Sequence, residues 1–253
     1  MLALFRKLRL KLLAESKFSR YLLYAIGEIF LVVIGILIAL GINNWNEKRK
    51  EQTFELQLLY SFKDGLQKDL QDLEGNVRWH KRGLAASDTI LLALENDIDY
   101  DLEKISRNFS DFMTPTFFRY STSAFETLKS KGITTISNKE LRDAIIGVYD
   151  SQYNFFLVNE RYFVDELERG YAEVFPTRFE SAYDYDLTQP DFPGSLKPLN
   201  FEALKTDKEM LYYIRSTRNR TKILLDWQYA QLKSRIVGLM SQIDSEIEHL
   251  ETK

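Results

Sequence analysis

The side chains that most often do chemistry in proteins are sparse in this 253-residue chain. It has no cysteine, which excludes disulfides, thiolate metal sites and cysteine nucleophiles. Its two histidines, His80 and His249, are too few for a multi-histidine zinc site. Either could act as a pH-sensitive group, but we expect both on the solvated surface.

The carboxylates show one notable cluster, Tyr183-Asp184-Tyr185-Asp186 with Asp191 nearby. Carboxylate oxygens are ligands that Ca²⁺ prefers, but the run lacks the glycine-centred loop of an EF-hand. We therefore expect a solvated acidic loop and no metal. The sequence also lacks a phosphate-binding glycine loop, a dinucleotide fingerprint and a serine nucleophile motif. It predicts no enzyme and no cofactor, and an enzyme that uses carboxylates alone is a weaker alternative.

Basic and aromatic clusters have two interpretations each. Arg215, Arg218 and Lys222 share one helical face, with Arg220 beside it. Such a face can bind an anionic partner, but we expect it to be solvated or salt-bridged. Phenylalanine-rich stretches at 109–118 and 155–163 are expected in the core, with an apolar ligand pocket between helices as the alternative.

The elements that carry these residues begin with an apolar run from Tyr21 to Ile42, which has one charge, Glu28. As a helix its 22 residues would span ~33 Å, which matches a bilayer core of ~30 Å. Tyr21, Tyr24 and Trp45 flank it, as interfacial anchors do. The sequence therefore predicts one transmembrane helix in contact with the lipid bilayer.

Two alternatives to a membrane span remain open. A buried helix of a soluble core is opposed by the unbroken apolar run from Ile29 to Ile42. A cleaved signal peptide would use the small-x-small sequence Ala39-Leu40-Gly41. Its apolar region would then be longer than the 7–15 residues typical of signal peptides.

Charge predicts the orientation of the span. Residues 1–20 hold six Lys or Arg against Glu15, a local charge of +5, so the rest of the chain carries −8. Basic flanks stay in the cytoplasm, which places the N-terminus inside and residues 43–253 outside the cytoplasm, although Lys48, Arg49 and Lys50 weaken the asymmetry. The acidic body argues against nucleic acid as a partner.

The segment 1–20 is also typical of a basic amphipathic helix. Its basic residues could contact an anionic membrane surface; they are Arg6, Lys7, Arg9 and Lys11. The alternative is a topology signal with no further role.

Glu28 is the ionisable residue within the span, and such residues usually face a partner or a cavity. At 100° per residue, Glu28, Gly35 and Ala39 fall within about 40° of one another. Gly35-x-x-x-Ala39 is a small-xxx-small pair that lets helices approach closely. We expect this face to dock another transmembrane helix, from a second copy or another protein. The alternative is that Glu28 reaches the interface and the small residues are incidental.

The stretch Tyr24-Ala-Ile-Gly-Glu-Ile-Phe-Leu-Val-Val-Ile-Gly-Ile-Leu-Ile-Ala-Leu-Gly-Ile-Asn-Asn-Trp-Asn46 comes after a basic Phe-Arg-Lys-Leu-Arg start. It resembles a family of uncharacterised bacterial single-pass membrane proteins, filed as a domain of unknown function. The stretch from Ser123 to Arg142 is similar to that family too. Gly41 departs from its pattern, where a larger polar residue is usual, which questions helix continuity at the membrane exit. The resemblance implies an inner-membrane protein with a periplasmic helical domain, and it carries no functional residues to transfer.

The part beyond the span predicts an all-α fold, an antiparallel helical bundle. Apolar residues step by 3 or 4 in three places: from Leu59 to Val77, from Leu141 to Val174, and from Leu225 to Ile243. We expect the first helix to continue from the span to about His80, a break near Gly83, and a new helix at Ser87–Glu95. Residues 96–120 should hold a short helix and a loop, and either that region or 179–200 could contain a short hairpin.

Local signals predict the helix ends. Capping boxes are expected to open helices at Ser123, Ser137 and Thr206. Gly132 and Pro176 are expected to end the first two.

The interpretation is a non-enzymatic, membrane-anchored interaction or scaffold protein of the bacterial envelope. The alternative is a sensor-like periplasmic domain that binds a small ligand between its helices and signals through a partner subunit.

Overall fold

The computed structural model describes residues 18–96 and 100–252, with the side chains of 18–20 excepted. The predicted membrane-surface residues Arg6, Lys7, Arg9 and Lys11 lie outside the described residues. The chain divides into two compact units, Met1–Glu55 and Leu56–Lys253.

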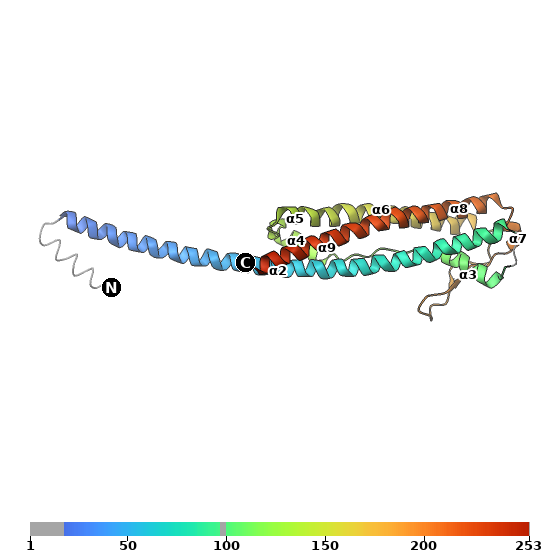
Figure 1. Ribbon diagram of the computed structural model, residues 1–253, viewed down its shortest axis with the longest axis horizontal. Helices are drawn as coiled ribbons and strands as arrows, with labels where there is room; N and C mark the ends of the chain where they lie inside the picture. Colours follow the sequence, from blue (N-terminus) through green and yellow to red (C-terminus); the bar gives the residue numbers. More distant parts are fainter. Residues whose placement is uncertain (1–17, 97–99, 253) are drawn as a thin grey trace. The chain divides into compact units, whose positions relative to one another are not determined.

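The first unit contains the start of helix α2, which runs from Phe18 to Glu95 (Figure 1). The helix passes through Gly41 without interruption, so the departure from the family pattern does not break it. Among the described residues, one helix is long and apolar enough to cross a membrane, and this helix is α2. None of its most apolar 18-residue window is buried.

The second unit is mainly helical, which confirms the all-α prediction. After α2 its helices are α3 (Leu102–Phe112), α4 (Ser123–Lys131), the 3₁₀ turn η1 (Ile133–Thr135), α5 (Lys139–Ile146), the π-helical η2 (Gly147–Gln152), α6 (Tyr153–Arg169), the π-helical η3 (Gly170–Val174), α7 (Phe201–Leu204), α8 (Lys208–Ile223), the π-helical η4 (Leu224–Tyr229) and α9 (Ala230–Glu251). The strands β1 (Asp184–Tyr185) and β2 (Gly194–Ser195) pair antiparallel.

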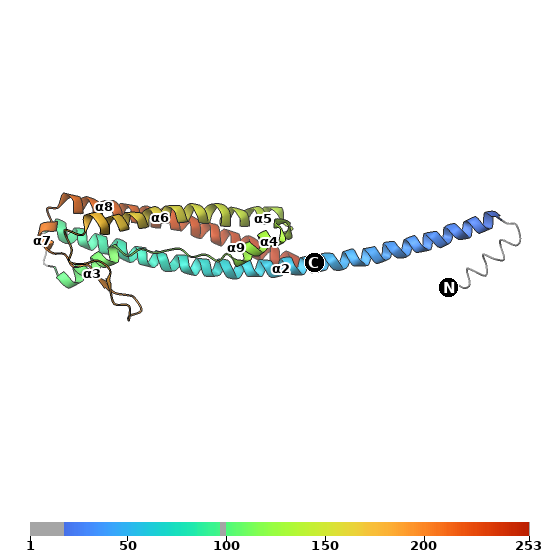
Figure 2. The same cartoon turned by 180° about the vertical axis from the view of Figure 1, so that it is seen from behind.

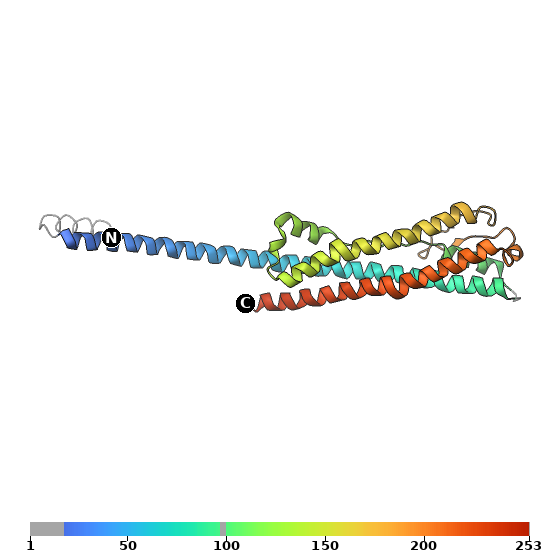
Figure 3. The same cartoon turned by 90° about the horizontal axis from the view of Figure 1, so that it is seen from above.

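Three long helical segments lie side by side in this unit: the second half of α2, α5 to η3, and α8 to α9 (Figures 1 and 3). The first two run in the same direction and the third runs against them. Between the first two the chain returns through α3, an extended segment and α4. This extended segment, residues 114–122, takes the place that a fourth helix holds in an ordinary bundle.

The predicted apolar stripes form the core of the bundle. Buried residues include Leu59, Phe62, Leu66 and Leu73 of α2; Leu141, Ile145, Val148, Phe156, Phe163 and Leu167 of the second segment; and Leu225, Tyr229, Leu232, Ile236, Leu239 and Ile243 of the third. Helices with one apolar stripe are stable only when that stripe packs against others, so the periodicity predicted both the helices and their inner faces.

The predicted helix break near Gly83 is wrong, because α2 continues to Glu95. The glycine instead lets α3 approach α2 closely. A Cβ at Gly83 would lie 3.0 Å from the carbonyl oxygen of Asp111. Beside it, Nε of Arg82 donates to Oδ2 of Asp111 at 2.7 Å.

The three predicted capping boxes are also wrong, although each helix begins within two residues of the predicted place. The N-cap of α4 is Thr122, whose side chain makes no capping hydrogen bond. The caps of α5 and α8 are Asn138 and Asp207, each one residue after the predicted serine or threonine. Each of these side chains accepts two backbone N–H groups. An Asn or Asp side chain is at least as good a cap as Ser or Thr, which explains why the cap is the later residue.

The predicted C-terminal signals are confirmed. Helix α4 ends at Gly132, whose φ of +103° is in the region that favours glycine. The helical structure before Pro176 ends at Val174. The short hairpin foreseen for 179–200 is the β1–β2 pair.

The second and third helical segments pack closely at Gly170, so a substitution there tests this packing. A Cβ at this position would lie 2.1 Å from Oη of Tyr213, which donates to the carbonyl oxygen of Glu166 at 3.1 Å. Gly170→Ala should therefore cost about 1–3 kcal/mol of unfolding free energy through overpacking. Gly75→Ala is the matched control: its Cβ would meet only the flexible Arg78 side chain at 3.7 Å, and it should gain about 0.5–1 kcal/mol.

Chemical unfolding of the full-length variants in detergent measures both effects. Equal free energies of unfolding for the two alanine variants would contradict this packing.

Candidate functional site

The extended segment 114–122 brings backbone N–H groups into the interior of the bundle without secondary structure to pair them. Buried amides without partners are costly. Acidic side chains accept three amides of the segment: that of Phe118 in the buried interior, that of Ser121 at a part-buried position and that of Arg119 at an exposed one. Glu160 accepts the N–H of Phe118 with both carboxylate oxygens at 3.0 Å. Asp72 accepts from the N–H of Arg119 at 3.0 Å and Asp69 from that of Ser121 at 2.7 Å.

Glu160 is one of two buried acids in this set, with only 4% of its residue exposed. Burial raises the pKa of its carboxyl to about 7, against the opposing effects of the Phe118 amide and the Tyr229 hydroxyl. Oη of Tyr229 lies 3.3 Å from Oε1 of Glu160. A carboxyl group with this pKa changes charge near neutral pH.

His80 extends this cluster and is buried, so the expectation of a solvated position is wrong. Its Nε2 lies 2.7 Å from Oγ1 of Thr116, which lies 3.3 Å from Oη of Tyr229. Its ring packs edge-on to Phe163 at 5.2 Å between centroids. Burial lowers the pKa of His80 to about 4, so the imidazole is neutral at pH 7.

A second cluster surrounds Asp69, which is also buried. Oη of Tyr153 donates to Oδ2 of Asp69 at 2.7 Å. Burial raises the pKa of Asp69, while its hydrogen bonds to Tyr153 and Ser121 oppose that rise. Tyr149 packs against Tyr153 at 5.2 Å between ring centroids, and its buried hydroxyl has no hydrogen-bond partner within the described part of the chain.

The tyrosines of both clusters stand next to π-helical turns. Segment η2 ends immediately before Tyr153, and η4 ends at Tyr229. A π-helical turn adds a residue and rotates the next part of the helix, and such turns are frequent at functional sites. Here they direct two tyrosine hydroxyls toward the buried carboxylates.

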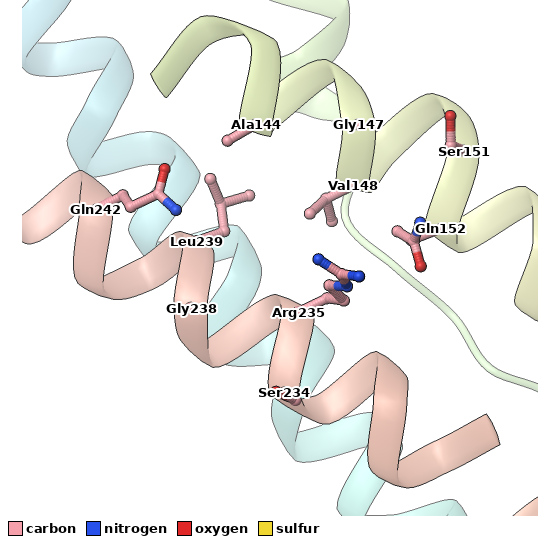
Figure 4. A pocket seen from close by; sticks show the side chains of 10 residues that line it. All are labelled: Ala144, Gly147, Val148, Ser151, Gln152, Ser234, Arg235, Gly238, Leu239 and Gln242. Atoms are coloured by element: carbon pink, nitrogen blue, oxygen red, sulfur yellow. The ribbon is translucent and has the colours of Figure 1, made fainter. Parts of the chain in front are cut away.

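The polar network holds a segment in place, because its carboxylates are occupied by amides and hydroxyls. The described residues do form a groove of about 380 Å³, but it lies between α5–η2 and α9 (Figure 4). It is lined by Ala144, Gly147, Val148, Ser151, Gln152, Ser234, Arg235, Gly238, Leu239 and Gln242. None of the network residues lines it, so the buried acids do not face this groove.

The predicted site residues of the membrane span lie on the first part of α2. Glu28, Gly35 and Ala39 are on its exposed apolar part, and Tyr24 and Trp45 are 51% and 63% exposed. Tyr21 is half-buried. The docking of this face against another helix stays a prediction.

The basic face of α8 is salt-bridged as expected. Arg215 pairs with Glu95 at 2.7 Å, and Arg218 pairs with Asp88. The acidic cluster lies in the β1–β2 hairpin. Over residues 18–96 and 100–252 there is no group of three or more His, Asp and Glu placed to hold a metal ion.

Comparison with known families gives one match. A family model described as a family of unknown function, DUF6090, covers residues 28–175. The chain belongs to this family. The DUF6090 region contains Glu28, His80, the extended segment and Glu160, and it ends at the last residue before Pro176. No curated protein and no solved structure matches. The predicted resemblance to an uncharacterised family is thus confirmed.

The missed residues had one usable signal. His80 comes after Leu73 and Val77 by the same steps of 4 and 3, so it continues the apolar stripe of α2. Glu160 lies between Phe156 and Phe163 on the buried face of α6 in the same way. A polar residue in register with an apolar stripe is a candidate for a buried, partnered group.

The two buried groups give opposite pH dependences. The pKa of Glu160 is raised from an ordinary 4.5 to about 7 in the folded protein. Its contribution to the free energy of unfolding is therefore fully present below pH 4.5 and is lost as the pH rises through 7. Relative to an ordinary pKa of 6.5, the lowered pKa of His80 gives a contribution present above pH 6.5 and lost as the pH falls through 4. Between pH 4.5 and 6.5 the two slopes oppose each other.

Glu160→Gln keeps an acceptor for the Phe118 amide and removes the pH dependence that the Glu160 carboxyl gives to the free energy of unfolding. Its unfolding free energy should rise by about 2–3 kcal/mol between pH 4.5 and 6.5 relative to the unchanged protein. His80→Gln should show the opposite difference. Urea unfolding of the full-length protein in detergent at stepped pH measures both, and parallel curves for all three proteins would contradict the assignment.

Proposed function

We propose that the chain is a non-enzymatic, membrane-anchored interaction protein of the bacterial envelope, held by one transmembrane helix at Tyr21–Ile42. One observation carries this proposal. The large apolar side chains between Leu22 and Ile42 are all 36–74% exposed, and none of the most apolar window is buried. Soluble monomers rarely expose contiguous apolar patches above a few hundred Å², so this surface needs a lipid environment.

The distribution of these side chains favours lipid over a protein groove. They occupy all sides of α2, because nearly every residue from Ile29 to Ile42 is apolar and exposed. A helix that is apolar all round belongs in a core or a membrane. A single docking partner would cover one side only.

The basic residues support the orientation that places the N-terminus in the cytoplasm and the helical domain in the periplasm. The face of Glu28, Gly35 and Ala39 supports docking against another transmembrane helix, from this protein or another. Apart from its chain neighbours and its own helix backbone, a Cβ at Gly35 would meet no atom of this chain within 4 Å, which leaves room for a neighbouring backbone.

The alternative is a sensor that binds a small ligand and signals through a partner subunit. The groove between α5–η2 and α9 is the observation that favours it, since about 380 Å³ is within the range of small-molecule sites. The scaffold is favoured because the buried acids already have protein partners and do not line the groove.

Extraction from membranes tests the anchor. The full-length protein should stay in the pellet after alkaline carbonate treatment. A variant with both Val33→Arg and Leu37→Arg should be released, because each arginine at the centre of a span costs about 2.5–3.5 kcal/mol. Tyr212→Arg is the matched control, since Tyr212 is 73% exposed on α8 of the second unit, and it should remain in the pellet. Release of the unchanged protein would overturn the proposal.

A further inference from the structure

The β1–β2 hairpin, residues 183–195, presents an acidic and apolar surface. Leu187 is 74% exposed and Phe192 50% exposed. Asp184, Asp186 and Asp191 lie within the same thirteen residues, which contain no Lys or Arg. Leu187 and Phe192 are therefore exposed apolar side chains within a segment whose charges are all negative.

The hairpin tip has a fixed shape. Asp186 accepts from the N–H of Thr188 at 3.0 Å and from Nε2 of Gln189 at 2.7 Å. The N–H of Asp186 donates to the carbonyl oxygen of Pro193 at 2.9 Å, and that of Phe192 to Gln189 at 3.1 Å. A segment ordered before it binds loses little conformational entropy in a complex.

The base of the hairpin is attached to the helices. The N–H of Leu196 donates to the carbonyl oxygen of Ser106 at 3.0 Å. A Cβ at Gly194 would lie 2.0 Å from Oγ of Ser110, so α3 and β2 are in close contact. Tyr183 and Phe192 have φ values of +61° and +40°, which are costly for aromatic residues and concentrate at functional sites.

A second exposed apolar surface lies on α6 and α8–η4. Its residues are Phe155, Val158 and Tyr162 of α6 with Ile223 and Trp227, each 50–61% exposed. The rings of Phe155 and Trp227 meet edge-on at 6.1 Å between centroids. Five half-exposed large side chains amount to roughly 500 Å² of surface, near the upper end for a monomer. We call this set the aromatic face.

Arg220 adjoins the aromatic face and Arg235 lies in the neighbouring groove, and no carboxylate pairs with either of them in the described part of the chain. Nη1 of Arg220 donates to the carbonyl oxygen of Tyr162 at 3.2 Å. Arg235 extends over the groove beside α5 and η2 (Figure 4). Their neighbours Arg215 and Arg218 both have carboxylate partners. The aromatic face therefore complements the hairpin in charge as well as in apolar character.

The two surfaces lie on opposite sides of the bundle. The hairpin projects beside α3, and α6 and α8 lie on the other side, as the front and back views both show (Figures 1 and 2). One chain cannot join its own hairpin to its own aromatic face. The complementary surfaces can meet only between different molecules.

We propose that the acidic hairpin of one copy of this protein docks on the aromatic face of a second copy. Leu187 and Phe192 pack against the exposed aromatic rings, and the aspartates approach Arg220 and Arg235. Such a contact is heterologous, so each pair of copies leaves one hairpin and one aromatic face free, and association can continue to larger assemblies. The contact uses only the second unit and goes beyond the membrane-anchored function proposed above.

Site-specific crosslinking tests this contact directly, because the chain has no cysteine and each introduced thiol is unique. Two differently tagged full-length versions would be co-expressed, one with Leu187→Cys and the other with Ile223→Cys, and their membranes oxidised. We expect a disulfide-linked product that contains both tags. Leu187→Cys with Ser61→Cys is the control, because Ser61 is exposed on α2 away from both surfaces.

A charge variant tests the specificity. Arg220→Glu in the copy that carries Ile223→Cys should lower the mixed product at least about tenfold, because it places like charges together. Arg220→Lys should retain most of it. The thermal midpoints of the variants identify any that fail to fold, and for those Arg235→Glu replaces Arg220→Glu.

Four results would overturn the proposal: no mixed product above the Ser61→Cys control, a product of Leu187→Cys with itself in place of the mixed one, a product with an unrelated protein, or no loss with the charge reversal. Carbonate extraction and a separate Ala39→Cys crosslink report on the anchor and its helix face. They distinguish a failure of this contact from a failure of the proposed function.

Discussion

The helical domain depends on how it satisfies the backbone of the extended segment 114–122. Two of the three long helical segments run in the same direction, so the chain must return between them, and it does so without forming a helix. An extended chain inside a bundle has no strand to pair with, and its amides would otherwise be unpaired in a region of low polarity. Asp69, Asp72 and Glu160 accept those amides at 2.7–3.0 Å. Asp69 and Asp72 belong to α2 and Glu160 belongs to α6, so the hydrogen bonds of the segment connect these two helices.

This arrangement explains the irregular features around the segment. Burial of Glu160 and Asp69 raises the pKa of both, which is tolerated because amide and hydroxyl donors surround the carboxylates. The π-helical turns orient Tyr153 and Tyr229 toward those acids. With the interior of the helical domain occupied in this way, the exposed apolar surfaces of that domain are outside, at the acidic hairpin and the aromatic face. The proposed interactions use these outer surfaces and leave the polar network unchanged.

The sequence predicted the features that depend on periodicity and failed where single side chains compete. Apolar steps of 3 and 4 located all three long helical segments and their buried faces, because burial of an apolar stripe decides helix position. Thr206 and Asp207 are equally plausible caps by sequence, and only the geometry of the chain entering α8 selects Asp207. Gly83 suggested a helix break, but the helix continues, and the glycine is explained by the close approach of α3, which no local sequence pattern shows. His80 and Glu160 were missed because their partners, Thr116 and Phe118, are 36 and 42 residues away in the chain.

Hydrogen exchange of the backbone amides in residues 114–122 is the most direct test that buried carboxylates hold this segment in the bundle. Residues without secondary structure ordinarily exchange fast, whereas amides bonded inside a core open only with large-scale unfolding. In the full-length protein, the amides of Phe118 and Ser121 should be protected about as strongly as those in the buried part of α2. Exchange of these two amides at the rate of an exposed loop would contradict this account of the helical domain.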